Sequence, residues 1–551
     1  MIIEVLKNHS SYLLIFLSII VFLYLFGRSF VIILEKVNLG PKEEIFGTKT
    51  NIFFPIIGLF FLGNLLILLN FLIPLKSNFV LVISFLLLSL NLLDFSFRLK
   101  IDYLNLIHLF VVPSILIFSL YGTNFHYDAG YYHLGNQLWI RETNLPFGLS
   151  NIFWAYGIGS IYEYIGAFFW LDSTFQSLHF INLIFVNTFF SFLFYHAVIS
   201  KDSKYKYSSY FLIIFALLDN FGYNGGRNGF LYVEGVGAFD NIVGIIVFFT
   251  IIFALYSLSI KSINKFELYI ISSLALFSLQ LKLSSFLLVI VLLRIIYLYM
   301  SQNNENIYKT FKLISINLIF FTSWMIKNYI STGCLVFPVN LTCINNFNWY
   351  RENSTLIYQN ITMSYSNSYS LSSNFFDWFQ DFISIEINQT VLFNYLLCLF
   401  ILVIFKYSYF KLANINSEYK KFFQIFILLN FIYYLFFGPI PRYMIGILLF
   451  IIAYLGFNIS SPKYKLNSEY IFIAIFIFAV ITFPRFNSYR TFLNNTHSLQ
   501  VGVPTLEIKN ETWTTPVGGE DQCWTIQFCT PEKSHNPVIV NGFFKTVYID
   551  N

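Results

Sequence analysis

A short polar segment between two apolar stretches holds the side chains best suited to chemistry. It spans residues 126–133 and reads His-Tyr-Asp-Ala-Gly-Tyr-Tyr-His. A carboxylate at the edge of an apolar stretch is costly to desolvate and is usually kept for function. Asp128 is therefore a candidate general base, and His126 and His133 are candidate acid–base groups or ligands. A simpler interpretation, compatible with the first, is that Asp128 caps a helix beginning near Ala129.

Other charged residues stand at the ends of apolar stretches further along the chain. Asp240 opens one stretch, Lys282 separates two stretches with almost no loop, and Arg442 follows Pro439-Ile-Pro. Arginine binds phosphate through a bidentate fork. Carboxylates together with cations suit proton abstraction and stabilisation of a leaving phosphate. The simpler interpretations are a favourable helix dipole for Asp240, a snorkelling Lys282 and an interfacial anchor for Arg442.

The composition is that of a polytopic membrane protein. Of 551 residues, 57% are hydrophobic and only 11% are charged, and the mean hydropathy is +0.66. A soluble domain averages about 25% charged residues. The net charge of +5 is spread over many loops, so it predicts no nucleic-acid partner. The sequence also contains neither a G-x-x-x-x-G-K-[ST] loop nor a G-x-S-x-G elbow.

Apolar stretches predict an all-α chain of about 14 transmembrane helices. A spanning helix needs about 20 mainly apolar residues, and the shorter stretches are expected to tilt. The predicted spans are 12–34, 53–73, 78–95, 104–121, 178–198, 208–221, 238–258, 267–283, 285–299, 311–329, 389–405, 422–438, 443–458 and 470–484.

The distribution of basic residues orients these spans. With the N-terminus outside, alternate loops on the cytoplasmic side carry more than half of the 33 lysines and arginines. The apolar stretch 150–171 is excluded as a span, because a crossing there would move the basic loop 201–206 to the outside. We expect an interfacial or re-entrant helix instead. Its residues expected at headgroup level are Trp154, Tyr156, Tyr162, Glu163 and Tyr164.

This topology predicts four regions along the chain. Residues 1–121 form an N-terminal four-span segment, and 122–177 form a first outer catalytic loop. Residues 178–484 form the transmembrane core, which includes the outer loop 330–388. The outer C-terminal segment 485–551 is polar and is predicted to be a small β-rich module or an ordered strap, since it is too short for a large core. Most chemistry-capable residues fall in the outer segments.

Four of the five cysteines lie in these outer segments, and Cys398 lies in a predicted span. An even set outside suits two disulfide bonds in an oxidising compartment. Neighbour pairing is the simplest of three connectivities, and free thiols or a zinc site are the alternatives. The four outer cysteines are Cys334, Cys343, Cys523 and Cys529.

Read in order, these elements resemble the membrane glycosyltransferases of the C-type fold, which include protein mannosyltransferases and the lipid A aminoarabinose transferase. Residues 128–133 resemble a D-E-x-Y-Y motif, with Ala129 replacing the second acid. Residues 238–241 resemble a T-P-D-like element, and 323–338 resemble a P-W-x-x-R-N run in which Lys327 stands for the usual Arg. Lys282 at a helix turn and Arg442 before a helix complete the series.

The resemblance implies transfer of a sugar from a polyprenyl-phosphate-linked donor to a glycan, lipid or protein acceptor. It places the chain in a bacterial inner membrane with the active side outward, as a bundle of helices with outer loops. It implies that Asp128 is the general base, that Lys282 and Arg442 contact the phosphate, and that Asp240 is an auxiliary acid. No cofactor is required, and a divalent metal stays an open alternative. Further predicted site residues are His133, Tyr131, Tyr132, Lys327 and Asn328.

The chain resembles still more closely a group of bacterial multi-span proteins of the surface-polysaccharide type. The resemblance rests on residues 127–133, 145–149, 282–284, 332–343 and 521–531. Two rival functions follow from the sequence. A repeat-unit polymerase or ligase would use Arg227, Arg442 and His133, whereas a polar-lipid transporter or flippase would need charged residues deep in the spans, where Lys282 and Arg294 are the main candidates.

Overall fold

The computed structural model describes residues 2–549 except 41–42, 94–102, 172–174, 201–203, 222–234, 345, 348, 413–416, 464–467, 495–500, 511, 518–520, 533–536 and 543. It is mostly helical, which confirms the predicted helical class. Within the described residues, the strands are short and form four two-stranded antiparallel sheets. Arg227, a candidate of the polymerase hypothesis, lies outside the described residues.

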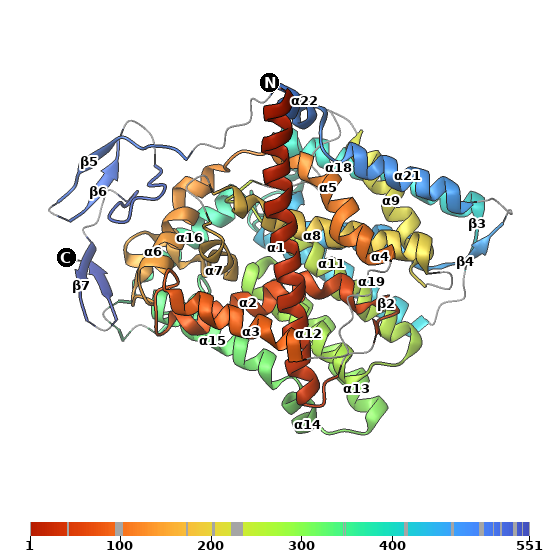
Figure 1. Cartoon of the computed structure of the whole chain (residues 1–551), viewed down its shortest axis with the longest axis horizontal. Coiled ribbons are helices and arrows are strands. Elements are labelled where there is room, and N and C mark those ends of the chain that lie inside the picture. Colours follow the sequence, from red (N-terminus) through yellow and green to blue (C-terminus); the bar gives the residue numbers. More distant parts are fainter. Residues whose placement is uncertain are drawn as a thin grey trace.

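The N-terminal half begins with the long helix α1, which runs across the whole molecule in Figure 1. It packs against α2 and α3, and α8 crosses the centre of the bundle. The bounds are α1 (Ile2–Lys36), β1 (Glu44–Ile45), β2 (Thr48–Lys49), η1 (Thr50–Phe53), α2 (Phe54–Asn70), α3 (Asn78–Leu93), α4 (Tyr103–Leu106), η2 (Ile107–Val111), α5 (Val112–Leu116), η3 (Ile117–Gly122), η4 (Ala129–His133), α6 (Leu134–Glu142), η5 (Leu149–Asn151), η6 (Trp154–Ile158), α7 (Ile161–Phe168), α8 (Gln176–Phe194), η7 (Tyr195–Ile199) and α9 (Lys206–Asn220).

The C-terminal half completes the bundle and adds the hairpins at its edge. The bounds are α11 (Asp240–Ile260), α12 (Lys265–Leu281), η8 (Leu283–Ser285), α13 (Leu288–Asn303), α14 (Ile307–Leu313), α15 (Ser315–Thr332), η9 (Asn340–Thr342), α16 (Glu352–Tyr365), α17 (Phe375–Ser384), α18 (Glu386–Tyr409), β3 (Phe410–Leu412), α19 (Ser417–Phe437), η10 (Pro441–Met444), α20 (Ile445–Phe457), β4 (Ile459–Pro462), α21 (Ser468–Thr482), α22 (Phe486–Asn494), β5 (Leu506–Ile508), β6 (Thr514–Pro516), β7 (Pro537–Val540) and β8 (Thr546–Ile549).

Seven helical segments among the described residues are long and apolar enough to cross a membrane. Two further pairs, α14 with α15 and α21 with α22, reach that length only as bent units, with bends of 73° and 55°. Every one of the predicted spans coincides with a helical segment, but α3, α13 and α20 are shorter than a full span, and so are α9 and α12. The number of 14 crossings therefore stays a prediction.

The stretch 150–171 forms no continuous helix. It breaks into η5, η6 and α7, the longest of which has eight residues. Its aromatic and acidic side chains do not lie at a surface, since Tyr156, Tyr162, Glu163 and Tyr164 are buried within the protein. The headgroup-level placement expected from the sequence is therefore wrong for these four residues, because other parts of the chain cover them.

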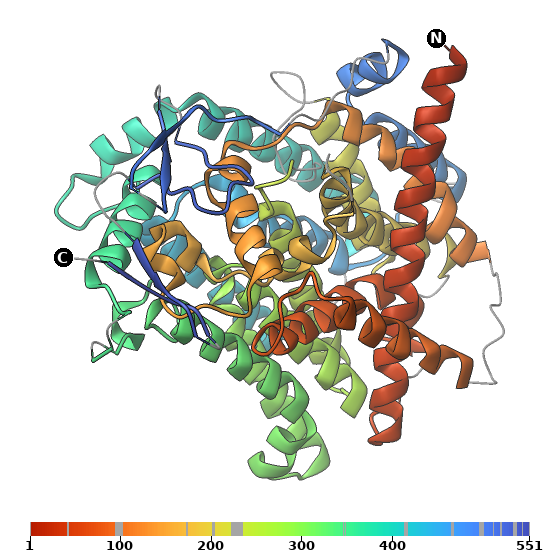
Figure 2. The same cartoon turned by 60° about the vertical axis from the view of Figure 1, so that its left-hand side comes forward.

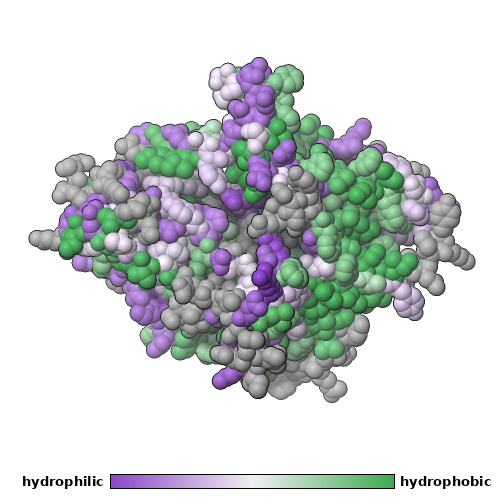
Figure 3. All heavy atoms as spheres, turned by 90° about the horizontal axis from the view of Figure 1, so that it is seen from above, coloured by the Kyte–Doolittle hydropathy of each residue, from purple (hydrophilic) through white to green (hydrophobic). Residues whose placement is uncertain are grey.

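Apolar side chains are exposed along several helices rather than at scattered points. Only 39% of the apolar window of α18 and 22% of that of α19 are buried. In Figure 3, apolar residues dominate the right half of one face, the side on which Figure 1 places α18 and α21, and polar residues are more frequent on the left. Exposed apolar surface on long apolar helices is what contact with lipid chains requires.

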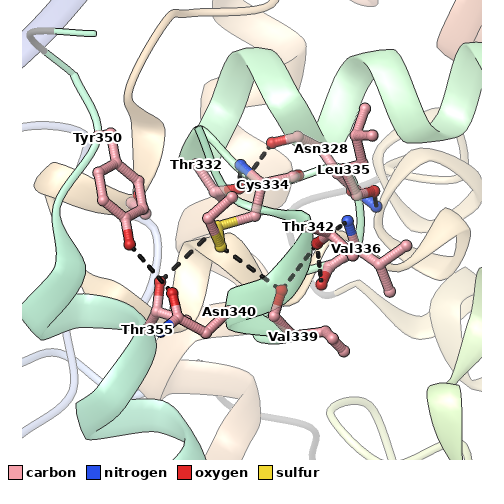
Figure 4. The surroundings of a disulfide bond; sticks show 12 residues. Asn328, Thr332, Cys334, Leu335, Val336, Val339, Asn340, Thr342, Tyr350 and Thr355 are labelled. Atoms are coloured by element: carbon pink, nitrogen blue, oxygen red, sulfur yellow. Dashed lines mark hydrogen bonds between the residues drawn. A yellow bond between two sulfur atoms is a disulfide. The ribbon is translucent and has the colours of Figure 1, made fainter. Parts of the chain in front are cut away.

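The C-terminal segment forms two small hairpins beside α6 and α16, away from the β3–β4 pair at the opposite edge (Figures 1 and 2). The cysteines pair as neighbours, Cys334 with Cys343 (Figure 4) and Cys523 with Cys529, and Cys398 is free and buried. The pairing agrees with the simplest connectivity expected from the sequence. The β-rich tail also agrees with the sequence.

Candidate functional site

Three charged residues from three distant segments meet at one point. Oδ1 of Asp240 forms an ion pair with the Lys282 ammonium. Oδ2 of Asp240 lies 3.0 Å from Nε of Arg442. Asp240 is 8% exposed, whereas the Lys282 and Arg442 side chains are 29% and 27% exposed. Two cations therefore share one carboxylate, which leaves a net charge of +1 that solvent can reach.

The ends of three helices bring these residues together. Asp240 is the first residue of α11, where a carboxylate interacts favourably with the helix dipole. Lys282 directly follows α12, and Arg442 lies in η10 before α20. Helices α11 and α20 approach closely at Gly244 and Gly446, where a Cβ on Gly446 would lie 2.5 Å from the Gly244 carbonyl oxygen. Small residues at this crossing thus allow Asp240 to reach Arg442.

Aromatic rings flank the two cations. The Lys282 ammonium lies 3.8 Å from the centre of the Tyr443 ring and 5.9 Å from that of Phe239. The guanidinium carbon of Arg442 lies 5.7 Å from the Tyr443 ring centre. Cation–π contacts of this kind hold an ammonium in place without neutralising its charge. The cluster of Asp240, Lys282 and Arg442 is called the cation cluster below.

Asp128 stands at the edge of the same region. Its carboxylate is 33% exposed and lies 3.4 Å from Nδ1 of His126. Burial raises the pKa of the Asp128 carboxyl, but the hydrogen bond with His126 and the positive charges nearby, including that of Arg442, hold it below its ordinary value. Asp128 is therefore ionised at neutral pH and close enough to the cation cluster to sense its charge.

The neighbours of Asp128 explain why small residues follow it. Ala129 is fully buried, and its backbone nitrogen would lie 2.5 Å from a Cβ on Gly237. A second acid at this position would therefore be buried rather than solvated. Gly130 faces the indole of Trp524, and a Cβ there would lie 2.6 Å from that ring. The tail thus packs directly on residues 126–133, where the backbone N–H of Trp524 donates to the Gly130 carbonyl at 2.9 Å.

His133 lies behind Asp128 in a buried hydrogen-bonded chain. Its Nδ1 is 2.5 Å from Oε1 of Glu163, and both side chains are almost inaccessible to solvent. Gln137 donates to the other Glu163 oxygen at 3.0 Å, and Trp170 donates to Gln137 at 2.7 Å. Nε2 of His133 has no hydrogen-bond partner among the described residues.

Aromatic side chains line the region next to Asp128. Tyr131 packs against Phe153 at 4.9 Å between ring centres, and Trp154 packs against Tyr358 at 5.4 Å. Burial and the charge of Asp128 raise the pKa of Tyr132 well above its ordinary value, so its hydroxyl keeps its proton. Aromatic walls with a few polar groups are typical of ligand sites.

Lys327 and Asn328 lie elsewhere. Lys327 is 5% exposed, and its ammonium donates to Oδ1 of Asn328 at 2.9 Å and lies 5.6 Å from the Tyr164 ring. With Glu163 it lines a cavity of only about 10 Å³, which holds one water at most. Within the described residues, neither Lys327 nor Asn328 makes a hydrogen bond or ion pair with the cation cluster, and their part in the site stays a prediction.

Sequence reasoning missed three residues that this arrangement includes. Glu163 partners His133, Tyr443 packs against Lys282, and Tyr358 packs on Trp154 within electrostatic reach of Lys282 and Asp128. Glu163 is flanked by apolar and aromatic residues on both sides, a pattern equally typical of a buried acid and of an interfacial one. Tyr358 gives no sequence signal, because α16 brings it to the site only in the folded chain.

The described residues do not fit a metal ion. No group of three His, Cys, Asp or Glu side chains converges within them. Asp240 is engaged by two cations, Glu163 by His133 and Asp128 by His126.

Comparison with known proteins identifies a family whose description states no function. A family model described as "Domain of unknown function (DUF8201)" matches residues 10–449. The chain belongs to this family. The match includes Asp128, the cation cluster and His133, whereas the C-terminal hairpins lie beyond it. No curated protein and no solved structure matches the chain.

Proposed function

We propose that this protein is an integral membrane glycosyltransferase of the C-type fold class. It would move a sugar from a polyprenyl-phosphate-linked donor to a glycan, lipid or protein acceptor on the outer face of a bacterial plasma membrane. The observation that carries the proposal is the ionised, solvent-accessible Asp128 beside a cation cluster with a net charge of +1. A base and a phosphate-binding charge in one region are what such a transfer needs.

The reaction is an inverting displacement. Asp128 takes the proton of an acceptor hydroxyl, whose oxygen forms a bond to the anomeric carbon of the donor sugar. The bond between that carbon and the phosphate oxygen breaks, and the electron pair leaves with the polyprenyl phosphate. Lys282 and Arg442 stabilise the charge that develops on this phosphate. Asp128 ends protonated and returns its proton to solvent, since it is 33% exposed.

Asp240 has a different role from the auxiliary acid that the resemblance implies. Its carboxylate pairs through one oxygen with Lys282 and through the other with Arg442, so both oxygens are already engaged by cations. We assign Asp240 to positioning, because it holds Lys282 and Arg442 at a fixed separation and prevents their mutual repulsion from opening the site.

Replacement of Asp128 tests the proposal. A deletion strain would be complemented with wild type, Asp128→Asn or Asp381→Asn at equal membrane levels, and surface glycans would be profiled by gel and mass spectrometry. Asp381 is an exposed carboxylate on α17 and is the matched control. Loss of general-base catalysis is worth about 10²- to 10⁴-fold in rate. We expect Asp128→Asn alone to remove one defined sugar from the glycan.

Two other results would change the assignment. A lost polymer ladder with an intact single repeat unit would indicate a polymerase or ligase, which joins two lipid-linked substrates. Full complementation by Asp128→Asn would contradict a catalytic base at this position and would favour transport of a polar lipid. If one phosphate contacts both cations, Lys282→Met and Arg442→Gln should also fail to complement the deletion strain. Their surface glycans should then lack the same sugar as that of Asp128→Asn.

A further inference from the structure

A larger cavity lies far from the candidate site. It has a volume of about 360 Å³ and is bounded by the end of α11, the second half of α13 and the start of α19. Asp240 and this cavity stand at opposite ends of α11, which has 21 residues and is therefore about 30 Å long. The polar residues that line the cavity are Lys261, Arg294, Ser301, Gln302, Glu418 and Tyr419.

The cavity carries an excess of positive charge. Arg294 pairs with Glu418 at 2.5 Å, and Lys261 adds a second cation that makes no ion pair within the described residues. The Glu418 side chain is 69% exposed, so its pair with Arg294 is open to water. An exposed ion pair contributes little and is readily exchanged for another anion. An anion that enters the cavity meets Lys261 at once and competes with Glu418 for Arg294.

Apolar side chains leave the protein surface directly beside these cations. Leu293 and Tyr297 on α13, on either side of Arg294, are 58% and 61% exposed. They are separated by four residues and therefore lie on one face of the helix. A cation pair next to an exposed apolar face is suited to a molecule with an anionic head and a hydrocarbon tail.

We propose that this cavity binds the phosphate headgroup of an anionic glycerophospholipid, whose acyl chains follow the exposed face of α13. The positive-inside pattern places the cavity at the cytoplasmic surface, where anionic headgroups meet basic pockets between helices. The apolar face favours a lipid over a free phosphate, since a free phosphate has no use for it. The site is independent of the glycosyltransferase proposal, and each can fail without the other.

Native mass spectrometry of the full chain in detergent tests this site. Phosphatidylglycerol, phosphatidylcholine and glycerol 3-phosphate would be offered to wild type and to Lys261→Gln/Arg294→Gln. At about fivefold per lost cation, the double variant should bind phosphatidylglycerol about 25-fold more weakly. Lys309→Gln/Lys312→Gln is the matched control, because it removes two exposed lysines of α14 that do not line the cavity.

A variant that is expected to bind the lipid more tightly distinguishes loss of the site from misfolding of the variant. Glu418→Gln removes the competing carboxylate and should strengthen phosphatidylglycerol binding severalfold. Equal loss in the Lys309→Gln/Lys312→Gln control would overturn the site in favour of general surface charge. Equal binding of phosphatidylcholine, or binding of glycerol 3-phosphate as strong as that of the lipid, would overturn the anionic-lipid assignment.

Discussion

At the scale of single residues, the buried pair of His133 and Glu163 is the feature that function explains best. Fully buried ionisable pairs are not retained for stability, because desolvation offsets most of their attraction. Here Gln137 donates a hydrogen bond to the second Glu163 oxygen. The hydrogen-bonded chain ends at His133, whose Nε2 has no partner among the described residues. The charge of His133 lowers the pKa of Asp128. We therefore predict that Glu163 acts on the candidate base through His133, as a positioning residue.

Glu163→Gln tests this role while keeping the size of the side chain. The change removes the carboxylate that pairs with His133, and a weaker positive charge at His133 would raise the pKa of Asp128. Asp128 must be ionised to act, so activity is lost as the pH falls through its pKa. We expect the acid limb of the rate profile to move to higher pH, with a rate about 10- to 100-fold lower, as for other orienting partners.

The measurement is the initial rate of sugar transfer in membranes over a pH series. Glu163→Asp keeps the charge and should retain the wild-type acid limb at a reduced rate. Trp170→Phe is the control for disturbed packing, because it removes only the far end of the hydrogen-bonded chain. A Glu163→Gln profile with an unchanged acid limb would leave Glu163 a purely structural role.

The sequence identified the charged residues of the site but not their partners. Asp240, Lys282 and Arg442 were predictable because charges at the ends of apolar stretches are costly and therefore informative. That they pair with one another depends on the approach of α11 and α20 at two glycines. Lys327 was predicted to join Lys282 and Arg442 as an outer cation, and the fold places its ammonium beside Asn328 and a small cavity that Glu163 and Tyr164 also line.

At the scale of elements, the C-terminal segment covers residues 126–133 and is hydrogen-bonded to them. This covering part of the tail is called the clasp below. Gln522 donates to the Tyr127 carbonyl at 2.8 Å, and Trp524 donates to that of Gly130 at 2.9 Å. The disulfide of Cys523 with Cys529 closes a short loop that carries Trp524. The sequence predicted a strap or β-rich module here, but no local pattern indicated that it would cover residues 126–133.

Removal of this disulfide tests the clasp. Cys523→Ser/Cys529→Ser should destabilise the docked tail by about 2 kcal/mol, at the lower end for disulfides because the loop is short. We expect the tail to be cut by protease at lower concentrations and sugar transfer to fall severalfold, with the helices still protected. Cys398→Ser, a change of the free buried cysteine, is the control. Faster cleavage with full activity would show that the clasp does not position Asp128.

Helix lengths show where sequence reasoning reached its limit. Hydropathy located a helix at every predicted span, because long apolar runs need helical backbone to satisfy their hydrogen bonds. It did not show that α14 and α15 meet at a bend of 73°, or that 150–171 would be buried in broken turns. Both features depend on packing against distant parts of the chain, which no local pattern encodes.

At the scale of the whole molecule, the chemistry and the basic loops occupy opposite ends of the bundle. Asp240 and Lys282 stand at one end of α11 and α12, and Lys261 and Lys265 stand at the other. The apolar faces of α18 and α19 lie between the ends that the sequence assigns to the two sides. This separation agrees with the positive-inside pattern and with disulfides on the side of the candidate site.

The predicted topology is testable with single cysteines. Ser373→Cys lies in the predicted outer loop 330–388, and Lys309→Cys lies in the predicted cytoplasmic helix α14, and both positions are exposed. The native cysteines are paired or buried and give a low background. In intact cells with a permeable outer membrane, an impermeant maleimide should label Ser373→Cys and leave Lys309→Cys unlabelled until the cells are lysed.

Labelling of Lys309→Cys but not of Ser373→Cys in intact cells would contradict the predicted topology. It would mean either that the whole bundle has the opposite orientation or that one more or one fewer segment crosses before residue 309. In the second case a change in the number of crossings between residues 133 and 240 would separate Asp128 from the cation cluster. The ion pair of Asp240 with Arg442 and the charge that Arg442 exerts on Asp128 require all three on one side. Labelling of Ser373→Cys alone is therefore the result that a single outer site demands.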